Sequence, residues 1–179
     1  KEAAFYIKKA ADNGNPKAMH RFGLMNEEGD GIPVNKKEAA RYYKMGVDNG
    51  DIDSLNDYGI LLKNGDGVEV DYKEAARLFK LSADNGKSVG MNNYGIMLRK
   101  GYGVPTNKQE AARYFKMAAD KGYPESMYQY GEMLNEGDGI PVDKKEAIRF
   151  FKMAIAEGNE NAMNSYGIML KFGNDVPQD

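Results

Sequence analysis

The chain lacks cysteine entirely and contains a single histidine among its 179 residues. The absence of cysteine excludes disulfide bridges, a thiolate nucleophile and metal sites with cysteine ligands. The one histidine, His20, has no second histidine or cysteine beside it in the pattern, so we interpret it as a surface or packing residue. The sequence therefore predicts no catalytic residues, no bound cofactor, no metal site and no enzymatic activity.

Long apolar segments and blocks of one charge are also missing. No run approaches the roughly 20 apolar residues that cross a bilayer. The 25 Lys and Arg residues are mixed with the 27 Asp and Glu residues along the whole chain, and the formal net charge is −2. The sequence thus has no basic segment that would attract nucleic acid or an anionic membrane surface. We predict a cytoplasmic protein that binds neither, although a targeting segment ahead of Lys1 would change that location.

The sequence has instead a repeat of 36 residues. The block Lys-Glu-Ala-Ala at 37–40 returns, with small changes, at 73–76, 109–112 and 145–148, and it also opens the chain at 1–4. An aromatic residue followed by glycine recurs with the same step at 22–23, 58–59, 94–95, 130–131 and 166–167. Self-similarity at a period of 20 to 50 residues is typical of repeat architectures.

Each repeat is predicted to contain two helices. The first, helix A, covers about residues 16–28, where apolar residues recur at helical spacing. Gly29 and Gly31 end it, because glycine enters left-handed backbone without steric cost. The second, helix B, begins after Asn35, with Glu38 three positions later in a capping-box arrangement, and Gly50 closes it.

A two-helix unit this short cannot bury its apolar face alone, so neighbouring units must cover it. Mid-helix glycines such as Gly23 cost about 1 kcal/mol against alanine, and we expect the backbone of another helix to approach there. The eleven methionines, for example Met45, Met117 and Met153, are predicted to fill the core, with an adaptable methionine-rich binding face as the alternative.

The positions of the repeated blocks predict one continuous α-helical solenoid and set the bounds of its repeats. We assign residues 1–15 to a half repeat (helix B) and residues 160–179 to a half repeat (helix A). Full repeats lie between them at 16–51, 52–87, 88–123 and 124–159. Because neither end carries a polar capping repeat, we expect the chain to be part of a longer array.

On these residues the chain resembles the Sel1-like repeat family, a relative of the tetratricopeptide repeat. The resemblance covers the whole chain, and in the first repeat it rests on Ala18, Gly23, Gly29-Asp30-Gly31-Ile32-Pro33, Asn35, Glu38-Ala39, Tyr42-Tyr43-Lys44 and Gly50. It implies a right-handed α/α superhelix that assembles protein complexes, with helix A on the concave side. The chain departs from the family in two respects. Residues such as Phe22 and Tyr58 are aromatic where the family has leucine, and four positions further on Asn26 and Leu62 stand where the family has an aromatic residue.

Two short motifs mimic functional sites. Residues 86–90 match the G-x-S-x-G pattern of a nucleophile elbow, but that motif requires a strand-turn-helix context and a histidine base. Glu28, Asp30 and Gly31 resemble part of a calcium loop whose closing glutamate would fall on Lys37. We interpret neither as a site, and we interpret Asp30, Asp66 and Asp138 as solvated turn residues.

Two sets of equivalent positions on helix A are the predicted peptide-binding residues. We call them the His20 column and the Leu24 column; they lie one helical turn apart and share a face. An asparagine-rich column beside an isoleucine-rich column suits an extended peptide, although the first could be merely solvated and the second could pack between repeats. The His20 column is His20, Asn56, Asn92, Tyr128 and Asn164, and the Leu24 column is Leu24, Ile60, Ile96, Glu132 and Ile168.

The sequence thus predicts a scaffold or adaptor that binds a protein or peptide on the concave helix A surface. The alternative is a structural spacer fused to a catalytic or membrane domain outside this chain, and an enzyme ranks third. The enzyme would need a clustered acid–base pair, whereas the acidic residues here recur one repeat apart. The partner's identity and the oligomeric state are not encoded in any motif.

Overall fold

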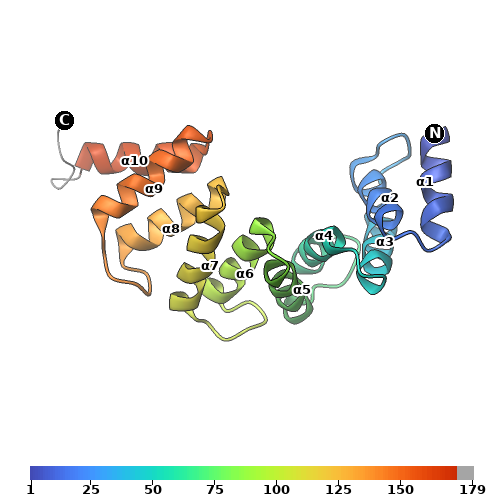
Figure 1. Ribbon diagram of the computed structural model, residues 1–179, viewed down its shortest axis with the longest axis horizontal. Coiled ribbons are helices and arrows are strands. Elements are labelled where there is room, and N and C mark those ends of the chain that lie inside the picture. The colour runs from blue at the N-terminus through green and yellow to red at the C-terminus, as the bar shows by residue number, and fades with distance from the viewer. Residues whose placement is uncertain (173–179) are drawn as a thin grey trace. The chain divides into compact units, whose positions relative to one another are not determined.

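Ten α-helices and no strand occupy residues 1–172, the part of the chain that the computed structural model describes (Figure 1). This confirms the predicted all-α fold with two helices in each repeat. The helices are α1 (Glu2–Asp12), α2 (Pro16–Glu28), α3 (Lys36–Asp48), α4 (Ile52–Asn64), α5 (Tyr72–Asp84), α6 (Ser88–Lys100), α7 (Lys108–Asp120), α8 (Pro124–Glu136), α9 (Lys144–Ala156) and α10 (Glu160–Phe172).

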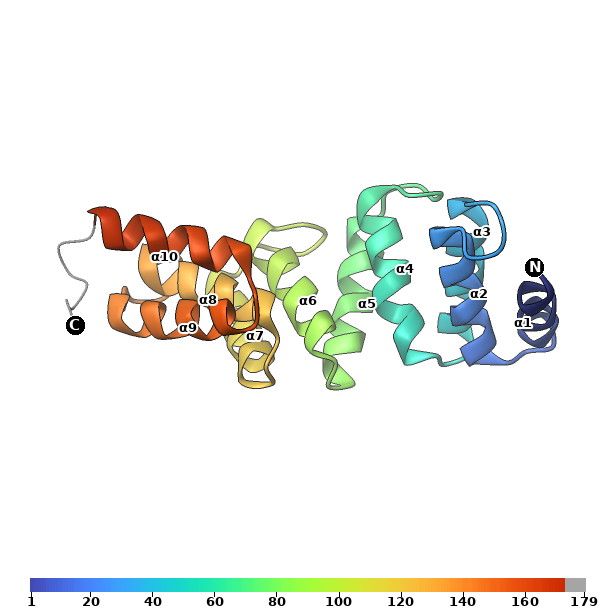
Figure 2. The ribbon, with the colours of Figure 1, turned by 90° about the horizontal axis from the view of Figure 1, so that it is seen from above.

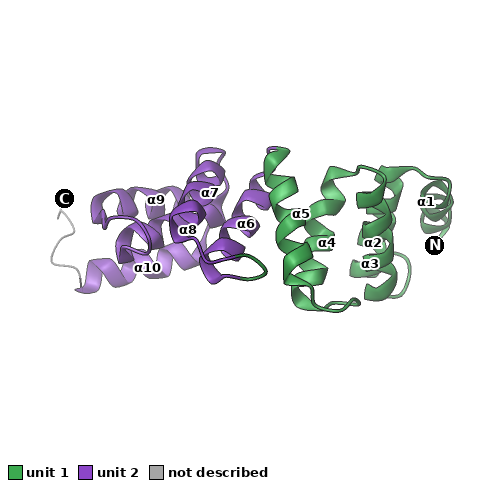
Figure 3. Cartoon of the chain, turned by 90° about the horizontal axis from the view of Figure 1, so that it is seen from below, with its two compact units in different colours: residues 1–85, 102–104 green, residues 86–101, 105–179 purple. Residues whose placement is uncertain are grey.

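The helices form two compact units, shown in different colours in Figure 3. The first unit comprises residues 1–85 and 102–104 and holds α1 to α5. The second comprises residues 86–101 and 105–179 and holds α6 to α10. Within each unit every helix packs mainly against the helices before and after it in the chain (Figure 2). Stability in such a stack is a sum of neighbour contacts.

An aromatic ring of helix B packs on the mid-helix glycine of helix A within each described full repeat. A Cβ atom placed on Gly23 would lie 2.5 Å from the ring of Tyr43, and one on Gly95 would lie 2.8 Å from the ring of Phe115. Both rings are fully buried. The expectation that a helix backbone approaches these glycines was wrong, because the space that glycine leaves is filled by a ring.

The aromatic residues before these glycines complete the same interface. Phe22 and Tyr42 meet edge to face with ring centroids 4.7 Å apart, and Tyr94 and Tyr114 do so at 4.9 Å. Edge-to-face pairs are a preferred aromatic geometry. The departure from leucine at this position, noted from the sequence, therefore gives each of these repeats a second aromatic contact between its two helices.

The helix B cap forms, but only half of the predicted capping box exists. The side chain of Asn35 accepts a hydrogen bond from the Glu38 amide at 3.1 Å, as expected. The Asn35 amide, however, donates to the Asn26 carbonyl at 2.7 Å, and the Glu38 carboxylate pairs with Arg41 at 3.1 Å. The cap amide thus ties the loop to the end of helix A, which leaves Glu38 free for the arginine.

The second glycine of each loop allows a close approach between repeats. Gly67 has a φ of 73°, and a Cβ atom there would collide with the backbone carbonyl of Lys36 at the start of α3. Gly103 stands in the same relation to the carbonyl of Tyr72. Glycine is required at both positions, because any side chain would suffer a strained backbone and a steric clash.

The methionines divide between the two helices. Those on α2, α6 and α8, such as Met97 and Met133, are buried and fill the core as predicted, whereas Met163 on α10 is 45% exposed. The three named from the sequence lie on helix B, where Met45 and Met153 are half-buried and Met117 is 39% exposed. The core prediction was wrong for Met117, because this position of helix B turns away from helix A.

Candidate functional site

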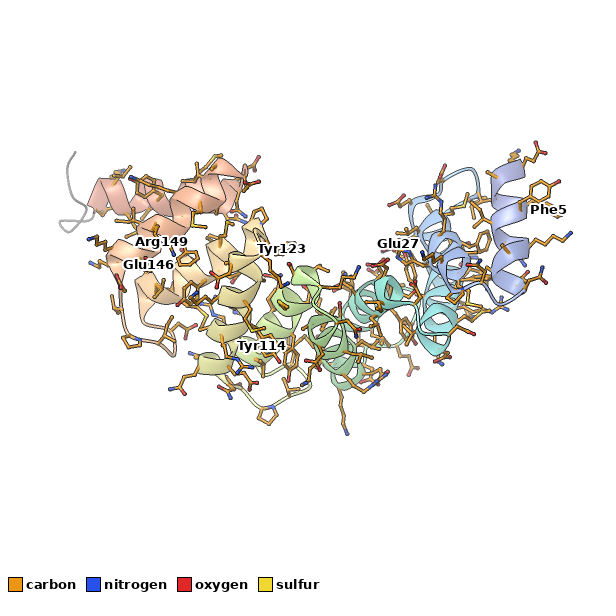
Figure 4. All side chains as sticks on the ribbon, in the orientation of Figure 1. Phe5, Glu27, Tyr114, Tyr123, Glu146 and Arg149 are labelled. Carbon is orange, nitrogen blue, oxygen red and sulfur yellow. The ribbon has the colours of Figure 1, made fainter. Side chains whose placement is uncertain are left out.

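On the outward face of helix B, neighbouring charged side chains form ion pairs with each other in successive repeats. Lys44 pairs with Asp48 at 2.7 Å, and the equivalent pairs in α5 and α7 are 2.8 Å long. Glu146 and Arg149 on α9, labelled in Figure 4, form a second type of pair at 2.6 Å. Each such exposed pair contributes only about 0.3–0.5 kcal/mol. This face is repetitive and offers few unpaired charges to a partner.

Helix A presents a face that changes from repeat to repeat. In the Leu24 column, Leu24 and Ile60 of the first unit and Ile96 of the second are half-buried aliphatic side chains. Ile168, on α10, is 51% exposed. Glu132 replaces the aliphatic residue on α8 and is half-buried as well. Partly exposed apolar side chains on successive helices are the feature that a docked polypeptide would use.

The asparagines of the His20 column are less accessible than an open groove requires. Asn56 is 8% exposed and Asn92 is 4% exposed, so neither is the solvated side chain that the alternative interpretation assumed. The Oδ1 atom of Asn92 accepts a hydrogen bond from the Ser126 hydroxyl at 2.9 Å. Asn92 therefore links α6 to α8, and only Asn164 on α10 is exposed.

His20 connects two successive helices A. Its Nε2 lies 2.8 Å from a carboxylate oxygen of Asp57, and its ring centroid lies 5.7 Å from that of Tyr43. The hydrogen bond with Asp57 raises the pKa of His20, with smaller contributions from the charges of Asp51 and Asp53, while burial lowers it. The histidine is thus a link between α2 and α4.

Tyr128 and Glu132 lie one turn apart on α8 and face α10. Burial raises the pKa of both groups, and the Ser165 side chain on α10 lowers it. Burial is the largest effect on Glu132 and raises the pKa of its carboxyl, as does the charge of Glu136. The Tyr128 ring also packs on Phe151 of α9, with centroids 6.3 Å apart.

Arg99 on α6 organises the polar contacts beside this pair, and the sequence analysis did not single it out. Its guanidinium donates to Asp138 at 2.6 Å, to Gln129 at 3.2 Å and to Glu136 at 3.3 Å. Lys108 approaches the other oxygen of Asp138 at 2.6 Å. The prediction that Asp138 is a solvated turn residue was wrong, because it binds two cations and is largely covered.

The loops carry a contact whose chemistry changes in one repeat. Lys36 pairs with Asp66 at 2.8 Å, and Lys108 pairs with Asp138 in the same way. The equivalent residues of the repeat between them are Tyr72 and Tyr102, which stack with centroids 5.0 Å apart. A signal for this contact was present in the sequence, since both members of a Lys–Asp pair become tyrosine together.

Glu27 and Tyr43 form a further polar contact between helices A and B. The Tyr43 hydroxyl donates to the Glu27 carboxylate at 2.7 Å, and burial raises the pKa of that hydroxyl well above its usual range. Glu27 is labelled in Figure 4 on α2. The contact positions α2 against α3, and nothing in it activates either group for chemistry.

Shallow depressions in the first unit lie on both helix faces. One, on helix A, is lined by Arg21, Leu24, Met25, Glu28 and Asp30. The other, on the helix B side, lies over Tyr58 between Lys37 and Lys44. Over residues 1–172, no three His, Asp or Glu side chains gather as a metal site would require, and no helix is long and apolar enough to span a bilayer.

The fold and this surface define an α solenoid of helix-turn-helix repeats with a regular helix B face and a variable helix A face. A Sel1 repeat profile matches residues 1–15, 16–51, 52–87, 88–123, 124–159 and 161–179. The chain belongs to the Sel1 repeat family. Members of this family generally form non-catalytic scaffolds and typically bind protein partners.

Solved structures agree with this assignment. A Sel1 repeat protein from Oxalobacter formigenes is 28% identical with a TM-score of 0.92, over 99% of this chain and 71% of that one. A protective antigen of uropathogenic Escherichia coli, c5321, is 27% identical with a TM-score of 0.87, over 99% of this chain and 38% of that one. The present chain thus spans well under half of that antigen. No curated protein matches this chain.

A more distant structure shares the fold alone. Cysteine-rich protein B of Helicobacter pylori is 19% identical with a TM-score of 0.58, over 74% of this chain and 95% of that one. The present chain contains no cysteine, so its repeats are held by packing and hydrogen bonds without disulfide bridges.

Proposed function

We propose that the chain is a non-enzymatic interaction scaffold that binds an extended protein segment on the exposed faces of its helices A. The observation that carries the proposal is the contrast between the two faces. Helix B repeats the same internally paired charges, whereas helix A carries half-buried aliphatic side chains beside a polar position that differs in every repeat, as in Arg21, Asp57 and Gln129. In a stack of repeats with the same backbone, the surface positions whose residues vary are those able to distinguish one partner from another.

Within the Leu24 column, Leu24, Ile60 and Ile96 are the proposed apolar contacts. Their partial exposure leaves surface to bury, and burial of apolar surface contributes about 25 cal/mol per Å². Polar residues beside them, such as Asp57 and Gln129, would pair with the backbone or side chains of the bound segment. The buried amides of Asn56 and Asn92 support the frame, and we do not assign them a direct contact.

A selection experiment tests the proposal without a known partner. A library of random 15-residue peptides is displayed on phage and selected against the immobilised 179-residue chain, and the affinities of the enriched peptides are measured by calorimetry. We expect Ile60→Ser and Ile96→Ser to weaken the best peptides at least tenfold. The matched control is Leu81→Ser, which truncates a side chain on helix B that is 39% exposed.

The control separates the proposed surface from the rest of the molecule. Equal affinity for the wild type and Leu81→Ser supports the helix A face, provided all variants melt as cooperatively as the wild type. If Leu81→Ser weakens binding as much as the isoleucine variants do, the assignment to helix A is wrong. If repeated selection enriches no peptide, the chain is better described as a structural spacer.

A further inference from the structure

Tyr128 and Glu132 are exceptions at the two helix A positions that define the columns. The other four repeats place asparagine or histidine at the first position and leucine or isoleucine at the second. Both exceptions fall on one helix, α8, at the i, i+4 spacing that puts two side chains on the same face. A carboxylate where every other repeat has an aliphatic chain calls for a reason specific to this repeat.

In the described part of the chain, the cation that acts on Glu132 is Arg99, which is engaged by other carboxylates. The groups that face it are the Ser165 hydroxyl on α10, Glu136 one turn on, and Arg99 on α6. Three of the five N–H groups of the Arg99 guanidinium donate to Asp138, Gln129 and Glu136, and the ion pairs of Arg99 are with Asp138 and Glu136. Among the described residues, Glu132 makes no ion pair, and half-burial has removed part of its hydration. Such a carboxylate gains more from an incoming cation than a fully solvated one does.

Two neighbouring features favour a basic ligand. Helix α8 carries Glu125, Glu132 and Glu136 and contains neither lysine nor arginine. The Tyr128 ring, which packs on Phe151, stands one turn before the carboxylate. An aromatic ring beside a carboxylate suits a lysine or arginine side chain, because the ring packs on the methylene stem or the cation and the carboxylate takes the charge.

We infer that Tyr128 and Glu132 form a specificity site for a lysine or arginine side chain of the polypeptide that binds the helix A face. The inference rests on the proposed function and adds the chemistry of one residue of the partner. The site sets the register of the bound segment within the second unit, where Ile96 on α6 accepts an apolar side chain and Glu132 on α8 fixes the basic side chain. Charge complementarity of this kind determines which segment binds more than how tightly it binds.

The test uses the phage selection with the whole chain and compares two variants. Peptides enriched on the wild type are expected to carry lysine or arginine at a common position. Glu132→Gln removes the charge and keeps the shape of the side chain. Glu136→Gln, the matched control, makes the same change one turn away on a carboxylate that already binds Arg99. The best peptide is then synthesised with its basic residue kept or replaced by methionine.

Six affinities, of two peptides for three proteins, decide the outcome. On the wild type we expect the basic peptide to bind about tenfold more tightly than the methionine peptide, with the difference shrinking as salt is added. On Glu132→Gln the two peptides should bind within about twofold of each other, whereas Glu136→Gln should keep most of the wild-type preference. A similar loss of preference in both variants would mean that general charge, and not this site, selects the peptide.

Failure of the inference and failure of the proposed function give different results. Peptides that bind the isoleucine surface without any enrichment of basic residues overturn the specificity site and leave the scaffold intact. The same holds if Glu132→Gln weakens both peptides equally. A chain that enriches no peptide at all contradicts the proposed function itself. Melting curves for each variant verify that Glu132→Gln folds, as expected for a column in which isoleucine is tolerated elsewhere.

Discussion

The hydrogen bond between Asn92 and Ser126 is the clearest case of a single residue that joins neighbouring repeats. The Asn92 side chain is 4% exposed and the Ser126 side chain is fully buried. We expect Asn92→Ala to destabilise the fold by about 1–2 kcal/mol, because the serine hydroxyl would lose its partner in a buried position. Chemical denaturation monitored by circular dichroism measures this change.

A double-mutant cycle isolates that interaction. Alanine occupies the position equivalent to Ser126 in two other repeats, as Ala18 and Ala162, so Ser126→Ala should be well accommodated. The double variant should lose less stability than the sum of the two single variants, because neither orphaned group is left. Strictly additive losses would show that the two side chains do not depend on each other.

His20 provides a second test at the scale of the residue, in which stability and the imidazole NMR signal are followed as a function of pH. The hydrogen bond with Asp57 raises the pKa of His20 above 6.5. The stability that this pair contributes is therefore fully present below pH 6.5 and is lost as the pH rises through the higher folded-state value. In Asp57→Asn the pKa should fall and this pH dependence should weaken. The only histidine of the chain gives one imidazole signal to follow by NMR, and an unchanged titration would contradict the pairing.

Sequence reasoning succeeded where the signal is local and failed where it depends on a partner helix. The bounds of α2 follow from Pro16 at its first turn and Gly29 at its end, both read within one segment. The burial of Asn92 depends on Ser126, which lies 34 residues away on another helix. The column pattern placed these side chains on one face of helix A, but it could not distinguish an amide that bonds a neighbouring helix from one that faces solvent.

At the scale of the element, helices A and B are joined by the packing of an aromatic ring on the mid-helix glycine. We expect Gly95→Ala to be destabilising, because its methyl group would lie 2.8 Å from the Phe115 ring, which is fully buried. Overpacking costs about 1–3 kcal/mol, and the gain of about 1 kcal/mol in helix propensity offsets only part of it. Thermal and urea denaturation measure the net loss.

Gly167 is the matched control for that substitution. It occupies the equivalent position on α10, and within the described residues no heavy atom other than those of its own helix backbone and chain neighbours would lie within 4 Å of an added Cβ. Gly167→Ala should therefore stabilise the helix by about 0.5–1 kcal/mol. Substitutions with the same sign at both positions would show that helix propensity, and not the ring, dominates the energetics of these glycines.

The caps of helix B allow a separate element-scale comparison. Asp71 accepts from the Glu74 amide at 2.9 Å, whereas the Glu74 side chain binds Arg77 and does not return to the cap. We expect Asp71→Ala to cost about 1 kcal/mol and Glu74→Ala to cost no more than about 0.5 kcal/mol, the value of an exposed helical pair. A larger loss for Glu74→Ala would indicate the reciprocal capping box after all. Denaturant titration of both variants under identical conditions decides between them.

At the scale of the whole molecule, the repeat makes stability a sum over neighbours. In both units the main contacts of each helix go to the adjacent helices of the chain, so removing a complete repeat should shorten the stack without leaving a core half-formed. The family profile places a full repeat at 124–159, and residues 123 and 159 occupy equivalent positions. A deletion of 124–159 therefore joins α7 to α10 through a linker in the native register.

We expect this shortened chain to fold with unchanged helicity per residue and to melt cooperatively at a lower temperature. Its denaturant m-value should fall by about a fifth, because 36 of 179 residues leave and m scales with the surface exposed on unfolding. The deletion also removes Tyr128 and Glu132, so the preference for basic peptides should disappear while apolar binding at Leu24, Ile60 and Ile96 persists. Loss of helicity would show that contacts beyond the neighbouring helices hold the fold, whereas a retained basic preference would place its source on another helix.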